Sequence, residues 1–105
     1  MTKQGIDLDS PAIREFCRKW KITELSVFGS ILRDDFRPDS DVDFLVTWDK
    51  GARWDAFDHM DAEEELAKIV GRKVDLVSRG AVEQSRNRFR KKHILSTAET
   101  IIAQR

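Results

Sequence analysis

The chain of 105 residues contains no tyrosine, a single cysteine and no long apolar run. Because a lone cysteine has no partner, Cys17 cannot form a disulfide within the chain. No apolar run approaches the roughly 18 residues of a membrane helix, and residues 1–9 lack the apolar centre of a signal peptide. We therefore predict a cytoplasmic protein with no membrane partner, in which no tyrosine is available for modification.

The chain also lacks a net charge, since 19 Lys and Arg balance 19 Asp and Glu. Bulk charge therefore predicts no direct nucleic-acid or membrane partner. The charges are unevenly distributed: residues 34–65 hold twelve acidic and three basic side chains, and residues 71–105 hold nine basic and three acidic ones. The length predicts one domain, residues 1–105, with a modest core.

A first helix of about ten residues is predicted after Ser10-Pro11, which is typical of an N-cap followed by proline at the first helical position. Its apolar residues recur at i, i+3, i+4 and i+7: Ile13, Phe16, Cys17 and Trp20. Cys17 lies on this stripe beside no evident His or Asp partner, so we expect it in the core and not as a nucleophile.

The second half of the chain predicts two further helical regions. A loose apolar stripe begins at Trp54 and ends at Val70, and Gly71 suits the C-terminal end of that helix. From Ala81 onward we expect helix with one apolar face, made by Ile94, Leu95, Ala98, Ile101 and Ile102. A capping-box pattern starting at Ser96 leaves a break near residues 93–96 open. The basic run 86–93 is either a solvated helix face or a binding surface for a triphosphate, a partner protein or RNA.

The most informative stretch joins two predicted strands. An apolar strand over residues 24–29 ends in Gly29-Ser30, and ten residues later Asp41 and Asp43 stand at the head of a second apolar strand. Alternate residues of a strand share a face, so the two carboxylates lie about 6.5 to 7 Å apart between their Cα atoms. Adjacent carboxylates repel each other and are poor strand formers. A divalent cation would resolve that conflict.

The residue types around this turn suit a nucleotide with its metal. Mg²⁺ prefers carboxylate oxygens and leaves positions for water and phosphates, and paired metals recur in displacement at phosphorus. Gly29 permits close approach of the backbone to a ligand. If Ser30 begins a short helix through Arg33, its free N–H groups suit a phosphate, to which the Ser30 hydroxyl and the Arg33 guanidinium would also donate.

A third acid, Asp75, lies at the centre of a short predicted strand, residues 73–77. A lone buried Asp is costly unless it is paired or metal-bound, and the plain alternative is an ion pair with Arg72 or Lys73. We interpret the other nearby acids as solvated surface, namely Asp34, Asp35 and Asp39. We expect His59, which sits among acids, to have no catalytic role.

Gly29-Ser30 followed by Asp41-x-Asp43 resembles the signature of the nucleotidyltransferase superfamily that includes DNA polymerase beta. The flanking residues 28–30 and 40–46 resemble the minimal nucleotidyltransferases, which are antitoxins paired with HEPN-domain toxins. This resemblance implies an α/β fold, a small mixed β-sheet with flanking helices. It also implies that Asp75 is the third catalytic carboxylate, because residues 71–77 resemble the segment that supplies it.

The function implied by the resemblance is transfer of AMP from ATP to a tyrosine of a HEPN ribonuclease toxin. Asp41, Asp43 and Asp75 would bind the metal, with two Mg²⁺ ions expected, and Gly29, Ser30 and Arg33 would hold the nucleotide. The absence of tyrosine in this chain agrees with an acceptor supplied by the partner. One departure is Asp34, where relatives commonly have glycine; an inward-pointing acid there would weaken triphosphate binding.

Two other functions remain open at this point. An antitoxin could neutralise its toxin by binding alone, with vestigial acids, although the complete set of Gly29, Ser30, Asp41, Asp43 and Asp75 argues against decay. A small-molecule nucleotidyltransferase is the other alternative. The chain has no second helical domain to hold such a substrate, which disfavours it.

Overall fold

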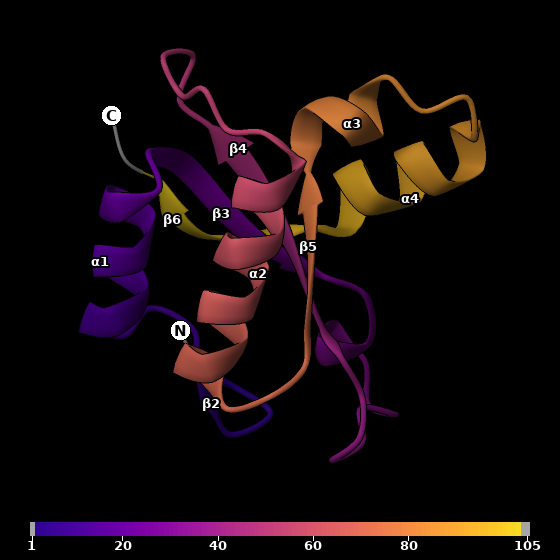
Figure 1. The fold of residues 1–105 in the computed structure, drawn as a ribbon. Helices are drawn as coiled ribbons and strands as arrows, with labels where there is room; N and C mark the ends of the chain where they lie inside the picture. The colour runs from indigo at the N-terminus through magenta and orange to yellow at the C-terminus, as the bar shows by residue number, and fades with distance from the viewer. Residues whose placement is uncertain (1, 104–105) are drawn as a thin grey trace.

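The computed structural model describes residues 2–103 as a four-stranded sheet with helices on both faces (Figure 1). The elements of the main domain are β3 (Ile22–Phe28), β4 (Val42–Trp48), β5 (Val74–Ser78), β6 (Glu99–Ala103), α1 (Pro11–Lys19), the 3-10 helix η1 (Gly29–Leu32), α2 (Ala56–Val70), α3 (Arg79–Glu83) and α4 (Arg88–Thr97). A small hairpin of β1 (Thr2–Lys3) and β2 (Ile6–Asp7) precedes them. No helix among residues 2–103 is long and apolar enough to cross a membrane.

The sheet has the order β5-β4-β3-β6 and is mixed. β3 pairs with β4 and with β6 antiparallel, whereas β4 pairs with β5 parallel, so that the connection between β4 and β5 crosses over through α2. The predicted α/β class with a small mixed sheet is confirmed. The strand expected at residues 24–29 begins earlier, at Ile22, and ends at Phe28.

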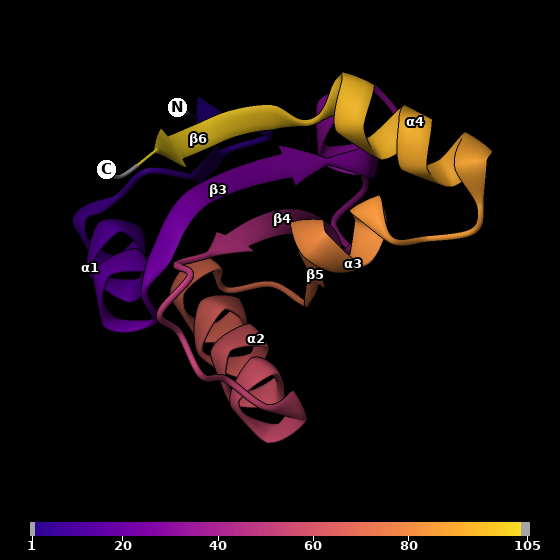
Figure 2. The same cartoon turned by 90° about the horizontal axis from the view of Figure 1, so that it is seen from above.

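The two faces of the sheet are covered by different helices. Figure 2 shows α1 and α2 beneath one face, with α3 and α4 grouped at the opposite side. The α1/α2 face carries the larger core, in which Phe44, Leu66 and Ile13 are fully or almost fully buried. The smaller cluster on the α3/α4 face consists of Phe28, Leu45, Val82 and Ile94.

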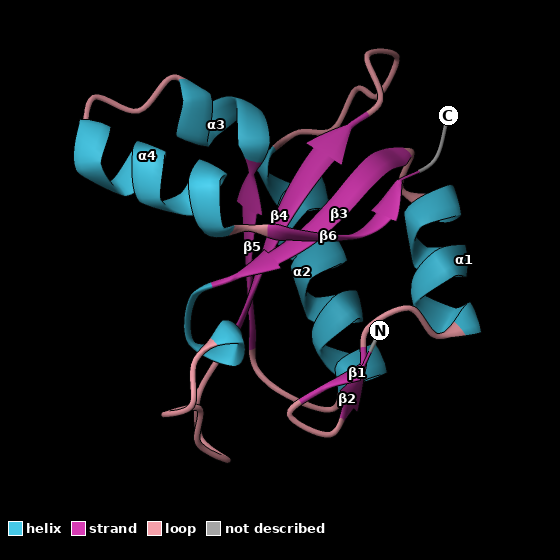
Figure 3. Cartoon of the chain, turned by 180° about the vertical axis from the view of Figure 1, so that it is seen from behind, coloured by secondary structure: helices cyan, strands magenta, loops and turns pink. Residues whose placement is uncertain are grey.

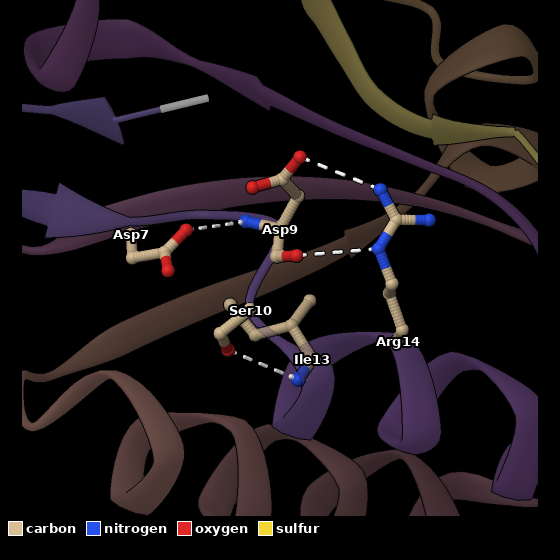
Figure 4. Close-up of polar contacts among 5 residues, drawn as sticks. All are labelled: Asp7, Asp9, Ser10, Ile13 and Arg14. Atoms are coloured by element: carbon tan, nitrogen blue, oxygen red, sulfur yellow. Dashed lines mark hydrogen bonds and ion pairs between the residues drawn. The ribbon is translucent and has the colours of Figure 1, made fainter.

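Helix α1 begins as the sequence predicts. The Ser10 hydroxyl oxygen accepts a hydrogen bond from the Ile13 amide at 3.3 Å, with Pro11 at the first helical position. Figure 4 shows Arg14 reaching back from the helix to the carbonyl and the carboxylate of Asp9. The four apolar residues of the predicted stripe are all buried, and Cys17 is among them. Burial raises the pKa of the Cys17 thiol to about 11, which keeps it protonated and inert.

Helix α2 starts two residues later than its apolar stripe suggested, because Asp55 caps it. Asp55 and Asp58 form a reciprocal capping box, each side chain accepting from the other's backbone amide at 2.9 and 3.0 Å. The helix ends at Gly71, whose φ of 72° is the left-handed conformation that glycine adopts without strain. The predicted C-terminal glycine of this helix is confirmed.

The prediction for the C-terminal region is wrong in two respects. The helix expected from Ala81 onward is interrupted, because α3 ends at Glu83 and α4 begins only at Arg88. Helix was expected through Ile101 and Ile102, but the helix ends at Thr97 and residues 99–103 form β6 on the open edge of β3 (Figure 3). The hydroxyls of Ser96 and Thr97 donate to the His93 carbonyl, so the capping box that the sequence left open at Ser96 does not form. Pairing with β3 satisfies the backbone of both strands, and this tertiary gain overrides an apolar spacing that also fits a helix.

Candidate active site

Three carboxylates meet where β4 and β5 begin. Asp43 and Asp75 are register partners on these parallel strands, so their Cα atoms are about 4.8 Å apart. Asp41 lies just before Val42, the first residue of β4. Because alternate residues share a face, Asp43 lies on the same face as Leu45, and Asp75 on that of Val77, which is the face that α3 and α4 cover. The structure therefore brings together the three acids that the sequence singled out.

Gly29 lies directly against this carboxylate row. Its preceding residue, Phe28, is the register partner of Asp43, and its own φ is 76°. A Cβ at this position would overlap Asp43 Oδ2 and lie 3.3 Å from Asp43 Cγ. Glycine is required here both by the backbone conformation and by the contact with the carboxylate.

Ser30 lies in the short helix η1, and Arg33 directly follows it. The Ser30 hydroxyl donates to the Asp41 carbonyl at 3.4 Å, which links the turn to the segment before β4. The helix expected through Arg33 ends one residue earlier, at Leu32, and Arg33 is its C-cap. The Arg33 Nε atom donates to Asp35 Oδ1 at 3.2 Å, and the side chain is largely exposed. Ser30 is thus fixed against the acids, whereas Arg33 is tethered at the surface.

Asp43 has the most perturbed carboxyl of the site. Burial, and then the negative charges of Asp75 and Asp41, raise its pKa to about 6, and the positive charges of Arg33 and Arg90 oppose this effect. Each contribution of the neighbouring acids reflects the cost of bringing like charges together. The site without a cation is therefore electrostatically unfavourable when all three carboxylates are ionised.

Arg90 is a site residue that the sequence argument did not single out. It lies on α4, lines a cavity together with Asp75, and its charge acts on Asp43. The only sequence signal was its membership of the basic run 86–93, which does not distinguish it from its neighbours. Its neighbour Phe89 is 90% exposed and does not line this cavity.

The alternative interpretation of Asp75 as half of an ion pair finds no support within residues 2–103. Arg72 instead donates to the carbonyls of Arg37 and Ser40 at 2.6 and 3.1 Å and lies over the Phe36 ring. Asp75 itself is exposed, and Lys73 forms no ion pair in the described part of the chain. Arg72 therefore fixes the loop before β4 and leaves the Asp75 carboxylate accessible.

The loop acids and His59 make surface or backbone contacts. The loop acids Asp34, Asp35 and Asp39 are exposed, as predicted. His59 Nε2 lies 2.6 Å from the Leu76 carbonyl oxygen, and Glu63 accepts from the Leu76 amide at 2.8 Å. These two α2 side chains bind the backbone carbonyl and amide of Leu76 at the outer edge of β5. This contact gives His59 a structural role.

The donor set fits Mg²⁺. Asp41, Asp43 and Asp75 are hard oxygen ligands, and their mutual repulsion favours a cation. Among residues 2–103, no group of three or more His, Cys, Asp or Glu side chains is already arranged to hold a metal ion. Mg²⁺ usually takes one or two carboxylates from a protein and completes its shell with water and substrate phosphates.

Two cavities lie on opposite sides of the carboxylate row. The first, of about 550 Å³, is lined by Asp75 and by residues of β4, β5, α2, α3 and α4: Trp48, Ala52, Trp54, Asp55, Ala56, His59, Leu76, Val77, Ser78, Ala81 and Arg90. The second, of about 350 Å³, is lined by Gly29, Leu32, Arg33, His93, Thr97 and Glu99. Since β5 and β3 flank β4, Asp43 stands between the two cavities.

A parallel pair of carboxylate strands beside a Gly-Ser turn defines a nucleotidyltransferase site, and the family comparison agrees. The model of the nucleotidyltransferase domain family matches residues 11–99, and the chain belongs to this family. The protein adenylyltransferase MntA of Thermococcus cleftensis is 33% identical over 70 residues, which are 67% of this chain and 69% of that protein. The chain spans 64% of the length of two candidate protein adenylyltransferases of Methanocaldococcus jannaschii, to which it is 32% and 34% identical.

Solved structures extend the likeness to the fold. A candidate minimal nucleotidyltransferase is 30% identical with a TM-score of 0.64, and the match covers 86% of both chains. A toxin-antitoxin complex with AMP-PNP gives a TM-score of 0.68 at 18% identity, covering 90% of this chain and 73% of that one. A complex of a tri-AMPylated Shewanella oneidensis HEPN toxin with its MNT antitoxin gives 0.59 at 18% identity, covering 88% and 67%. The predicted resemblance to minimal nucleotidyltransferases is confirmed.

Proposed function

We propose that this chain is a metal-dependent protein adenylyltransferase that moves AMP from ATP to a tyrosine hydroxyl of a HEPN-domain toxin, and thereby acts as an antitoxin. The observation that carries the proposal is the pairing of Asp43 with Asp75 across β4 and β5, directly against the Gly29 turn. The family membership and the adenylyltransferase names of the relatives support it. A structural neighbour that pairs an antitoxin with an AMPylated HEPN toxin supports the choice of acceptor.

The donor nucleotide would lie on the β3 side of the acids. Gly29 allows close approach of the triphosphate to the backbone, and the hydroxyl of Ser30 is a second donor to it. Arg33 lines the adjoining cavity together with His93, and its guanidinium would turn from Asp35 to a phosphate. This arrangement would place the β- and γ-phosphates near Gly29 and the α-phosphate near Asp43.

The carboxylates of Asp41 and Asp43 would hold Mg²⁺, with Asp75 as a third ligand and two ions in all. When bound, the metal would neutralise charge that develops on the transferring phosphate and on the leaving pyrophosphate. Asp43 would become fully ionised in that state, because a nearby cation lowers the pKa that burial and the other acids raise. The neighbouring Arg33 and Arg90 guanidinium groups add fixed positive charge on either side.

Asp75 would activate the acceptor. Its carboxylate is exposed and faces a cavity, so it can accept the proton of an incoming hydroxyl. The hydroxyl oxygen then forms a bond to the α-phosphorus, and the bond from that phosphorus to the bridging oxygen of pyrophosphate breaks. Since this chain contains no tyrosine, the acceptor tyrosine belongs to the partner.

The test is an incubation of this chain with a cognate HEPN-domain toxin, ATP and Mg²⁺, followed by intact-mass measurement of the toxin. The parent should add one or more groups of about 329 Da each, the mass of AMP in ester linkage, through the displacement described here. An Asp41→Asn/Asp43→Asn variant should add none. The matched control is Asp34→Asn/Asp39→Asn, which removes two exposed acids from the same loop and should transfer as the parent does. No mass change with the parent would refute the proposal.

A further inference from the structure

The residues proposed to hold the triphosphate, Gly29, Ser30 and Arg33, do not line the cavity beside Asp75. This cavity holds about 550 Å³, within the range of roughly 300–1,000 Å³ that is usual for ligand sites. Asp75 and Arg90 make its polar end, and Trp48, Trp54 and His59 make an aromatic end. Trp48 and His59 meet edge to face with ring centroids 6.0 Å apart. A lining of this kind suits an aromatic side chain that carries one polar group.

The direction of the reaction assigns this cavity to the acceptor. Displacement at phosphorus places the attacking and leaving oxygens roughly in line. The second cavity, next to Gly29 and Arg33, lies on the β3 side of Asp43, and the first lies on the β5 side. If pyrophosphate leaves toward Gly29, the hydroxyl has to arrive from beyond Asp75. This step rests on the function proposed above.

Two exposed apolar residues of α2, Phe57 and Met60, directly follow the lining residues Ala56 and His59 in the chain, although neither lines the cavity itself. Met60 stands one turn after the lining residue Ala56, and Phe57 stands one turn before Met60 on the neighbouring stripe. Their exposed fractions are 63% and 75%, high for large apolar side chains of a small domain. Asp61 lies one turn after Phe57 and is also exposed. The stripe therefore offers apolar anchors with a negative rim.

The edge of β5 next to this stripe has no free backbone groups at Leu76 with which an added strand could pair. Both the amide and the carbonyl of Leu76 are already bonded, to Glu63 and His59. An incoming segment would have to displace both contacts to pair with β5 at this point. Recognition of the acceptor must then use side chains that enter the cavity and cover the α2 stripe.

We propose that the cavity between α2, β5 and α3, extended by Phe57 and Met60, is the docking surface for the acceptor protein, and that it takes a basic segment whose aromatic, hydroxyl-bearing side chain reaches Asp75. The aromatic wall fits the ring, Asp75 fits the hydroxyl, and the acidic rim at Asp61 fits Lys or Arg of the same segment. The surface thus sets which hydroxyl is modified, separately from the binding of ATP.

The first experimental arm truncates the anchors. Phe57→Ala/Met60→Ala should lower kcat/KM for the toxin at least about tenfold, the loss expected for interface anchors, while the Kd for AMP-PNP stays unchanged. Phe89→Ala is the matched control, since Phe89 is exposed like Phe57 and Met60 but lies on α4 and not on the α2 stripe. A lower kcat/KM with Phe89→Ala and an unchanged one with the double variant would overturn the proposal. Weaker AMP-PNP binding by the double variant would also overturn it, because the cavity would then belong to the nucleotide base.

The second arm fills the cavity. Ala81 on α3 lines it and is exposed, so Ala81→Phe should block AMP transfer and leave AMP-PNP binding intact. Ala12→Phe, at an exposed position of α1, is its control and should transfer normally. Unimpaired transfer by a folded Ala81→Phe variant would overturn the proposal. If the parent transfers no AMP at all, the proposed function fails instead. The affinity of Phe57→Ala/Met60→Ala for the toxin then decides the docking surface: weaker binding supports it and unchanged binding refutes it.

Discussion

The two faces of the sheet differ in what their residues do. Among residues 2–103, the cluster under α1 and α2 contains eighteen buried side chains, whereas the one under α3 and α4 contains four. The α3/α4 face instead presents Asp43 and Asp75. The α1/α2 face therefore supplies most of the apolar burial that stabilises the fold. On the α3/α4 face, strand positions that could have held packed apolar residues hold the charged residues of the site instead.

The largest effect should come from the well-packed face. Phe44 is fully buried there, and Phe44→Ala should lower the free energy of unfolding by about 3–5 kcal/mol, the usual cost of an aromatic-to-alanine change in a core. The next residue, Leu45, points to the opposite face and is as deeply buried. Leu45→Ala should cost less than Phe44→Ala, because its cluster is smaller. Urea titration of both variants measures this, and a larger loss for Leu45→Ala would contradict the contrast between the faces.

On the site face, Ser30→Ala should change binding and not folding. Loss of one hydrogen bond to a charged phosphate should weaken AMP-PNP by about 1.5–3 kcal/mol, measured by calorimetry. Ser26→Ala is the comparison, since Ser26 lies on β3, the strand that leads into η1, and its hydroxyl donates to the Thr100 hydroxyl instead. Equal affinity of Ser30→Ala and parent would mean that the backbone of the turn alone holds the nucleotide.

Gly29→Ala should affect both folding and activity. A left-handed backbone costs a non-glycine residue about 1–2 kcal/mol, and the new methyl group would press on the Asp43 carboxylate. We expect a lower free energy of unfolding together with loss of AMP transfer. Gly71→Ala tests the strain by itself, because φ there is also positive but nothing lies within 4 Å of the added Cβ. Comparable loss of transfer in both variants would show that the Asp43 contact is unimportant.

The smallest effect concerns the charge of Asp43. Because the folded protein holds this proton with a pKa of about 6, against about 4 in an unfolded chain, ionised Asp43 lowers stability as pH rises from about 4 through about 6. Without metal, Asp43→Asn should therefore be more stable than the parent at about pH 7.5 and equal to it near pH 4. Added Mg²⁺ should stabilise the parent and not the variant. Melting curves that do not respond to pH, metal or the substitution would remove the cation site.

The two faces also differ in how far the sequence predicts them. The α1 stripe, its Ser10 cap and the Gly71 terminus of α2 follow local rules of spacing and capping, and the structure confirms them. The C-terminal region obeys no such rule. Residues 99–103 become β6 only because β3 offers an unpaired edge far away in the sequence, which no local pattern records.

The residues of the site also differ in how far the sequence predicts them. Gly29, Ser30, Asp41 and Asp43 could be identified because they lie on one hairpin-like connection, with their spacing visible in the chain. Asp75 needed the family resemblance, since the parallel pairing that brings it to Asp43 depends on α2 crossing over. The positions of Arg90 and of the cavity depend on how α3 and α4 pack over the sheet. The sequence predicted these two helices as one helical region.

The most direct measurement is made in cells that express the HEPN toxin together with this chain. The parent should protect the cells, and the toxin recovered from them should carry AMP. The Asp41→Asn/Asp43→Asn variant should still bind the toxin, since a stable interface of about 800 Å² per partner extends well beyond two residues, but it should leave the toxin unmodified and growth arrested. If the variant protects as well as the parent while the toxin mass is unchanged in both, the antitoxin acts by occupancy and the catalytic account is contradicted.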